Sequence, residues 1–148
     1  MSASMKGTYY HNIDTKGRVI IPSKIREALG NKCVITRSFE NCLSIYSMEE
    51  WENLTEKLKG LGNKKEAIRN LKRFLQANAA DCEFDTQGRT VIPPTLRNLI
   101  GLEKEVVIVG NGEKAEIWNK SDWDELMSSE SFSVETLKEQ LEELDIDF

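Results

Sequence analysis

Short runs of β-forming residues open the chain and are separated by a turn and a short helix. β-branched and aromatic side chains over residues 8–10, 18–21, 34–36 and 43–46 predict strands, and the last two runs predict a hairpin around Glu40. Pro22 ends the second run and can begin a helix, which we expect over residues 24–29 with Gly30 as its C-cap. The same order of elements is expected again over residues 85–118.

Between these two regions, and again at the C-terminus, apolar residues recur at helical spacing. The three helical stripes consist of Trp51, Leu54, Leu58 and Leu61; of Ile68, Leu71 and Leu75; and of Val134, Leu137, Leu141 and Leu144. Gly60 and Gly62 separate the first two stripes, and Ser133 is a suitable N-cap for the third. We expect the third helix to pack on its own chain, although its spacing also fits a short coiled-coil seam.

A seventeen-residue segment occurs twice, 71 residues apart. Residues 14–30 read DTKGRVIIPSKIREALG and residues 85–101 read DTQGRTVIPPTLRNLIG, with eight identical positions. The likeness resumes over residues 43–51 and 115–123, which both end in tryptophan. Two copies indicate two like units related by a pseudo-twofold axis. Each copy alone, about 45 residues, is too short to bury a stable core, so we expect the copies to share one.

These patterns predict an α+β fold that is mainly β with short helices. A first unit is expected over residues 6–51, a helical connector over 52–76, a second unit over 77–123 and an acidic C-terminal helix over 124–148. The chain lacks a run of about 18 apolar residues, so we expect no membrane span. Its three cysteines are odd in number and widely spaced, which favours buried thiols in a reducing compartment.

Charge is distributed unevenly along the chain. The formal net charge is −5, but residues 121–148 hold ten acids and one lysine, whereas residues 1–120 hold nineteen basic and fifteen acidic residues, a net of +4. A basic body with an acidic tail is compatible with a polyanionic partner. It is equally compatible with a solvated acidic helix on an ordinary body.

The repeated turn carries the strongest candidate site. Asp14 and Asp85 can accept hydrogen bonds from the turns that follow, while Gly17 and Gly88 let the backbone reverse. The residues that we expect to face DNA are Arg18 and Arg89 at the strand starts, Lys16 and Gln87 at the loop tips, and Arg26 and Arg97 on the short helices. Arginine suits phosphate and guanine edges because its planar fork donates in pairs. In the competing interpretation, the loop arginines are internal partners of the aspartates and the helix arginines are simply solvated.

The sequence gives little support to catalysis. It has one histidine, no Cys-x-x-Cys and no glycine-rich phosphate loop, so we predict neither a metal site nor a cofactor. The Asp-Thr pairs at residues 14–15 and 85–86 are similar to those of aspartic proteases. An arginine nearby would keep such carboxylates ionised rather than let them share a proton. We therefore predict that the protein is not an enzyme.

With these residues in view, the chain resembles the MraZ family of bacterial transcriptional regulators, which carry two SpoVT-AbrB-type units in tandem. The resemblance rests on DTKGRVIIP and DTQGRTVIP, on FENCLSIY and KEVVIVG, and on the spacing of the helical connector. It implies a swapped-hairpin β-barrel closed by both units and a ring-like homo-oligomer. The family's loop arginine falls on Arg18 and Arg89, and an arginine of the similar AbrB proteins matches Arg26 and Arg97.

The resemblance also implies a function. A regulator of this family would act in the cytoplasm, on the nucleoid, and bind double-stranded DNA at direct repeats in the promoter of the division and cell-wall gene cluster. Because Gln87 replaces the charge of Lys16, we expect the first unit to contribute more. The alternative is a non-enzymatic scaffold whose repeat serves only to build a ring and bind protein.

Overall fold

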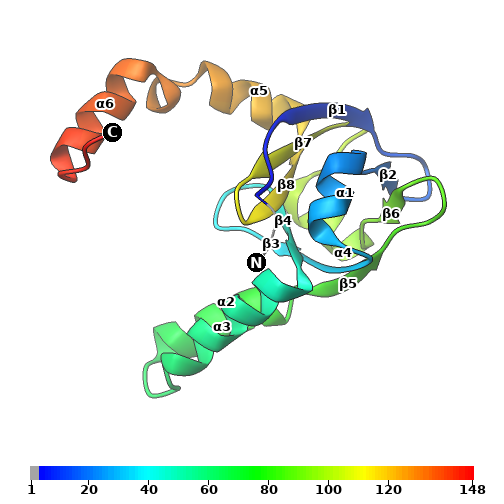
Figure 1. Cartoon of the computed structure of the whole chain (residues 1–148), viewed down its shortest axis with the longest axis horizontal. Helices are drawn as coiled ribbons and strands as arrows, with labels where there is room; N and C mark the ends of the chain where they lie inside the picture. Colours follow the sequence, from blue (N-terminus) through cyan, green and yellow to red (C-terminus); the bar gives the residue numbers. More distant parts are fainter. Residues whose placement is uncertain (1–3) are drawn as a thin grey trace.

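The computed structural model describes residues 4–148, in which the two units have the same order of elements (Figure 1). The first contains β1 (Thr8–Asn12), β2 (Arg18–Ile20), α1 (Ser23–Leu29), β3 (Lys32–Arg37) and β4 (Leu43–Ser47). The connecting helices are α2 (Met48–Gly60) and α3 (Glu66–Gln76). The second unit contains β5 (Ala80–Glu83), β6 (Arg89–Val91), α4 (Pro94–Ile100), β7 (Glu105–Asn111) and β8 (Lys114–Asn119). The chain ends with α5 (Lys120–Ser128), the 3-10 turn η1 (Glu130–Phe132) and α6 (Val134–Glu143).

The two units exchange their first strands. Six antiparallel strands pair in the order β1-β7-β8-β4-β3-β5, so β1 pairs with the hairpin of the second unit and β5 with the hairpin of the first. When each strand is replaced by its counterpart in the other unit, the same order results, read from the opposite edge of the sheet. A pseudo-twofold axis therefore passes between β4 and β8, as the repeat predicts.

The closed barrel that the resemblance implies is not confirmed. β2 and β6 form a separate two-stranded ribbon, and β1 and β5 remain the two edges of the six-stranded sheet. Both ribbon strands are three residues long and are followed after one residue by Pro22 or Pro93, which have no N–H to extend a ladder. The ribbon therefore packs next to β1 and β5 without hydrogen-bonded closure.

A single core joins both units. Side chains from the ribbon, the short helices and the sheet meet in one cluster of buried residues, which confirms the shared core expected from the size of each copy. The largest of these side chains include Ile21, Ile25, Leu29, Ile92 and Leu96, together with Ile35, Ile45, Ile108 and Ile117 of the sheet. Because counterparts from the two units touch in this cluster, neither unit has a core of its own.

The three cysteines are buried free thiols, as the sequence predicts. Cys33 and Cys82 lie opposite each other in β3 and β5, with their sulfur atoms 3.3 Å apart. Cys42 belongs to a smaller cluster with Val107 and Trp118, and burial raises the pKa of its thiol to about 12. The thiol of Cys42 is thus un-ionised at neutral pH.

Two helical segments extend from the body at separate places (Figure 1). α2 and α3 both contact β3, and the Thr36 hydroxyl donates a hydrogen bond to the Leu75 carbonyl over 2.8 Å. α5 packs on β7 and β8, where the Trp118 and Trp123 rings meet edge to face. Within residues 4–148, no helix is long and apolar enough to cross a membrane.

The prediction that the third helical stripe packs on its own chain is wrong. α6 lies away from the body in Figure 1 and, of the described elements, packs closely only with the neighbouring turn η1. Its apolar residues are exposed accordingly, by 64% at Val134, 43% at Leu137 and 68% at Leu144. The stripe predicted a helix correctly, but apolar spacing carries no information about which surface covers it.

Candidate nucleic-acid interface

The β2–β6 ribbon turns one face to the core and the other to the solvent. Val19, Ile21, Thr90 and Ile92 point inward and are buried. The outward positions are Arg18, Ile20, Arg89 and Val91, with Arg18 opposite Val91 and Ile20 opposite Arg89. Since residues two apart share a face of a strand, the two arginines lie diagonally on one surface, flanked by two exposed apolar side chains.

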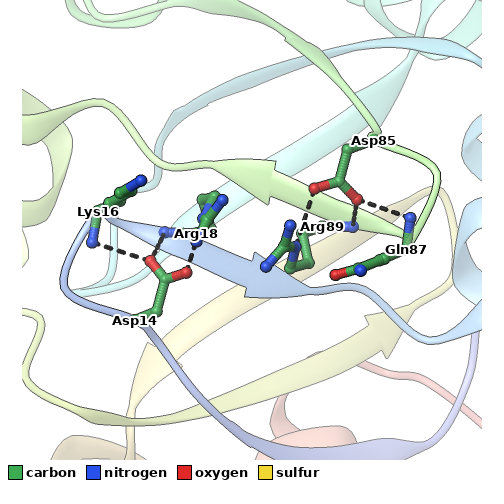
Figure 2. Close-up of polar contacts among 6 residues, drawn as sticks. All are labelled: Asp14, Lys16, Arg18, Asp85, Gln87 and Arg89. Atoms are coloured by element: carbon green, nitrogen blue, oxygen red, sulfur yellow. Dashed lines mark hydrogen bonds and ion pairs between the residues drawn. The ribbon is translucent and has the colours of Figure 1, made fainter.

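Each ribbon arginine is clasped by the aspartate that begins its loop (Figure 2). Oδ1 of Asp14 accepts hydrogen bonds from the backbone N–H groups of Lys16, at 2.9 Å, and Arg18, at 2.8 Å. Oδ2 of Asp14 accepts the Nε–H of Arg18 at 2.7 Å. The hydrogen bond from the Arg18 backbone, together with its side chain, holds the pKa of Asp14 below its usual value.

The second loop repeats this geometry. Asp85 accepts the backbone N–H groups of Gln87 and Arg89 and the Arg89 Nε–H, all at 2.9 Å. Backbone donation from Arg89 is again the main cause of the lowered pKa of Asp85. The two aspartates therefore make the same set of hydrogen bonds in both turns.

The clasp leaves part of each guanidinium exposed. The side chains of Arg18 and Arg89 are 30% and 27% accessible, and within residues 4–148 only their Nε atoms donate to a protein acceptor. The sequence left internal pairing and outward exposure as competing interpretations. In the structure, Arg18 and Arg89 each show both. The terminal nitrogens are available for a ligand while the aspartate fixes their direction.

The loop tips are exposed, and they differ in charge. Lys16 and Gln87 occupy equivalent positions, and their side chains make no hydrogen bond or ion pair within the described part of the chain. The first loop therefore presents an exposed cation and the second an exposed amide. This is the charge difference between the units that the sequence predicts.

The helix arginines lie elsewhere than the sequence suggested. Arg26 does not stand free on α1: its Nε–H donates to the Ile21 carbonyl at 2.8 Å, and its guanidinium lies against Gly88 of the other unit. Arg97 donates to the Ile92 carbonyl at 3.0 Å and lies against Gly17. Both side chains are half-buried. In both units the helix arginine follows the loop arginine by eight residues, and this repeated spacing is the trace of the contact in the sequence. The spacing does not show that each helix arginine packs on the loop of the opposite unit.

The β2–β6 ribbon, its two loops and the helix arginines behind them carry an excess of positive charge, which suits an anionic ligand. Five cations (Lys16, Arg18, Arg26, Arg89, Arg97) outnumber the two aspartates, which leaves a local charge of +3 in a chain of net charge −5. Residues 4–148 hold no group of three or more His, Cys, Asp or Glu side chains that could bind a metal ion. Each carboxylate is held ionised by an arginine, so the two do not share a proton as in an aspartic protease.

Comparison with known proteins places the chain in a family. The family model of the MraZ proteins, described as antitoxin-like, matches residues 5–74 and again residues 75–144. The chain belongs to the MraZ family. The boundary between the two matches lies within α3, close to the end of the connecting helices.

Relatives from three bacteria illustrate the extent of this likeness. The chain is 46% identical over 142 residues to a protein of Caldanaerobacter subterraneus subsp. tengcongensis, covering 96% of this chain and 99% of the relative. It is 46% identical over 140 residues to one of Acetivibrio thermocellus and 43% identical over 140 residues to one of Moorella thermoacetica, each time covering 95% of this chain and 98% of the relative. All three carry the name transcriptional regulator MraZ, which is the name of a regulator and not of an enzyme.

Proposed function

We propose that this MraZ-family chain is a sequence-specific DNA-binding transcriptional regulator whose DNA-facing surface is the outer face of the β2–β6 ribbon with its two loops. The observation that carries the proposal is the pair of aspartate-clasped arginines on one face of the ribbon. The names of the relatives support a role in transcription. The site of action is the cytoplasmic nucleoid, at direct repeats in the promoter of the division and cell-wall genes.

A two-stranded ribbon fits the major groove of B-DNA, which is about 12 Å wide and about 8.5 Å deep. Arg18 and Arg89 donate their terminal nitrogens in pairs to guanine O6 and N7, the commonest specific contact of arginine. Ile20 and Val91 lie beside them and suit the methyl group of thymine. The clasp reduces the side-chain entropy lost on binding, since Nε is already anchored.

The loop tips contact the DNA backbone. Lys16 provides a charge for a phosphate and Gln87 provides an amide, so the first unit contributes more to affinity. A single ribbon makes few contacts, so tight binding requires several linked protomers. Direct repeats suit an assembly in which neighbouring ribbons point the same way.

The assembly is a homo-oligomeric ring. Two surfaces support this: the exposed apolar stripe of α6, and the basic stretch of residues 57–73 in α2 and α3. Residues 134–148 hold six acids and one lysine, and residues 57–73 hold seven basic residues and one acid, so the two surfaces are complementary in charge. A contact between two different surfaces of neighbouring copies repeats head to tail and closes into a ring when the rotation allows.

The test is DNA binding measured by fluorescence anisotropy at several salt concentrations, on the region upstream of the gene and on a shuffled sequence. Arg18→Ala should lose the preference for the upstream sequence, by about 1–3 kcal/mol per base contact. Lys16→Ala should weaken binding to both DNAs and reduce the salt slope by about 0.9. Lys104→Ala, at an exposed lysine that belongs neither to the ribbon and its loops nor to the proposed ring contact, is the control and should change neither.

Two results would overturn the proposal. If Arg18→Ala binds the upstream DNA with wild-type preference, the ribbon is not the reading surface. If the wild type binds neither DNA at low salt, while light scattering still shows an oligomer, the chain is a scaffold and not a regulator.

A further inference from the structure

The loop of each unit is seated on residues of the other unit. The Gly17 carbonyl accepts the N–H of Ile92 at 2.8 Å, and the Ile92 carbonyl accepts the Nε–H of Arg97 at 3.0 Å. Ile92 therefore joins the first loop to a side chain of α4. The second loop has the same arrangement, in which Ile21 binds the Gly88 carbonyl at 3.0 Å and accepts Arg26 at 2.8 Å.

The guanidinium groups of Arg97 and Arg26 also pack against the backbone of the first and the second loop, respectively. A methyl group built on Gly17 would lie 2.7 Å from Cζ of Arg97, and one built on Gly88 would lie 2.7 Å from Cζ of Arg26. Each guanidinium thus lies flat against the backbone at the point where the loop reverses with positive φ. The geometry is the same in both units, whose loops differ only at Lys16 and Gln87, so it does not depend on the charge at the loop tip.

We propose that Arg97 and Arg26 are positioning residues of the DNA interface, each of which sets the loop of the opposite unit. This inference rests on the function proposed above and changes the role of two of its residues. The resemblance implies that the helix arginines contact phosphate; here they act through Gly17 and Gly88. Binding energy from one loop therefore depends on a distant residue: Arg97 lies 80 residues from Gly17, and Arg26 lies 62 residues from Gly88.

The crossed arrangement predicts an unexpected ranking. Because the first loop carries Lys16, it contributes more to affinity, and its support is Arg97 of the second unit. Arg97→Lys should therefore weaken binding more than Arg26→Lys does. If both arginines contacted phosphate directly, lysine would retain the charge and each variant would keep most of its affinity and its full salt slope.

The first experiment needs no DNA. Hydrogen exchange measured by mass spectrometry on the full-length protein reports the loop amides of Lys16, Gly17 and Arg18, which are all bonded to Asp14. Arg97→Lys should speed exchange in the peptide covering residues 13–20 and leave residues 84–91 unchanged. Arg26→Lys should do the reverse. Faster exchange in the loop of the same unit, or no change in either loop, overturns the inference.

The second experiment is a pair of double-mutant cycles on the upstream DNA. With Arg97→Lys in place, Lys16→Ala should cost at least about threefold less affinity than it costs in the wild type, because the loop is already displaced. With Arg26→Lys in place, Lys16→Ala should cost its full amount to within about twofold. Equal behaviour of the two cycles overturns crossed positioning. If the wild type binds no DNA at all, the proposed function is overturned instead. The hydrogen-exchange experiment would still decide whether Arg97 and Arg26 position the opposite loops.

Discussion

Replacing Gly17 with alanine tests how closely the two units are fitted together. Gly17 has a φ of +78°, and an added methyl group would lie 2.7 Å from Cζ of Arg97 and 3.0 Å from its Nε. Gly101 is the control, because it is left-handed, with a φ of +62° and a ψ of 42°, but has no atom within 4 Å of an added methyl group. The two substitutions therefore share the backbone strain and differ in the collision.

The expected magnitudes follow from this difference. A left-handed conformation costs an alanine about 1–2 kcal/mol, which both variants should lose. The added methyl group must displace the Arg97 guanidinium, the far end of a flexible side chain, so Gly17→Ala also loses the hydrogen bond from Arg97 to the Ile92 carbonyl, about 0.5–1.5 kcal/mol. We expect Gly17→Ala to lower the free energy of unfolding by about 1.5–3.5 kcal/mol and Gly101→Ala by about 1–2 kcal/mol.

Urea unfolding at a fixed protein concentration measures both values. The collision is tested by adding Gly17→Ala to a chain that already carries Arg97→Ala, where only the backbone strain of about 1–2 kcal/mol should remain. Equal losses for Gly17→Ala and Gly101→Ala would refute the close fit. So would an unchanged cost of Gly17→Ala in the Arg97→Ala background.

Three further results are expected. Hydrogen bonds hold the pKa of Asp14 and of Asp85 below the usual 3.8. The stabilisation that each carboxylate gives its loop is therefore complete above about pH 4 and is lost as the pH falls through the lowered pKa. Loop hydrogen exchange between about pH 2 and 6 should show this loss, and Asp14→Asn should remove the pH dependence from the first loop alone. The Cys42 thiol should resist iodoacetamide at pH 8 until urea unfolds the chain, and rapid alkylation of the folded protein would contradict its burial. Leu137→Glu should lower the assembly mass in light scattering without loss of helicity, whereas an unchanged mass would show that α6 is not part of the ring contact.

Contacts between near neighbours in the sequence could be predicted from it. The clasp joins Asp14 to Arg18, four residues apart, so the Asp-x-x-Gly-Arg pattern contains every group that forms it. The short helix after Pro22 is equally local, because the proline ends one element and begins the next. These interactions need no partner from outside the segment, and the structure confirms them.

Contacts between distant segments could not be predicted in the same way. The repeat predicted the pseudo-twofold axis, but the exchange of β1 and β5 depends on pairing with strands about 95 and 50 residues away, and strand propensity does not specify a partner. The same reason explains why Arg26 and Arg97 were expected to face DNA. Each has a local acceptor, but the surface on which it packs belongs to the other unit.

The most direct test of the central claim is site-specific photo-crosslinking to the upstream DNA. A single cysteine is introduced at Ile20, on the outer face of the ribbon, or at Phe132, far from it, since both side chains are 44% exposed and the three natural thiols are buried. With a photoreactive group on that cysteine, we expect crosslinks from position 20, concentrated on the upstream repeats, and essentially none from position 132. Crosslinks from position 132 with none from position 20 would show that DNA, if bound, lies on another face of the protein.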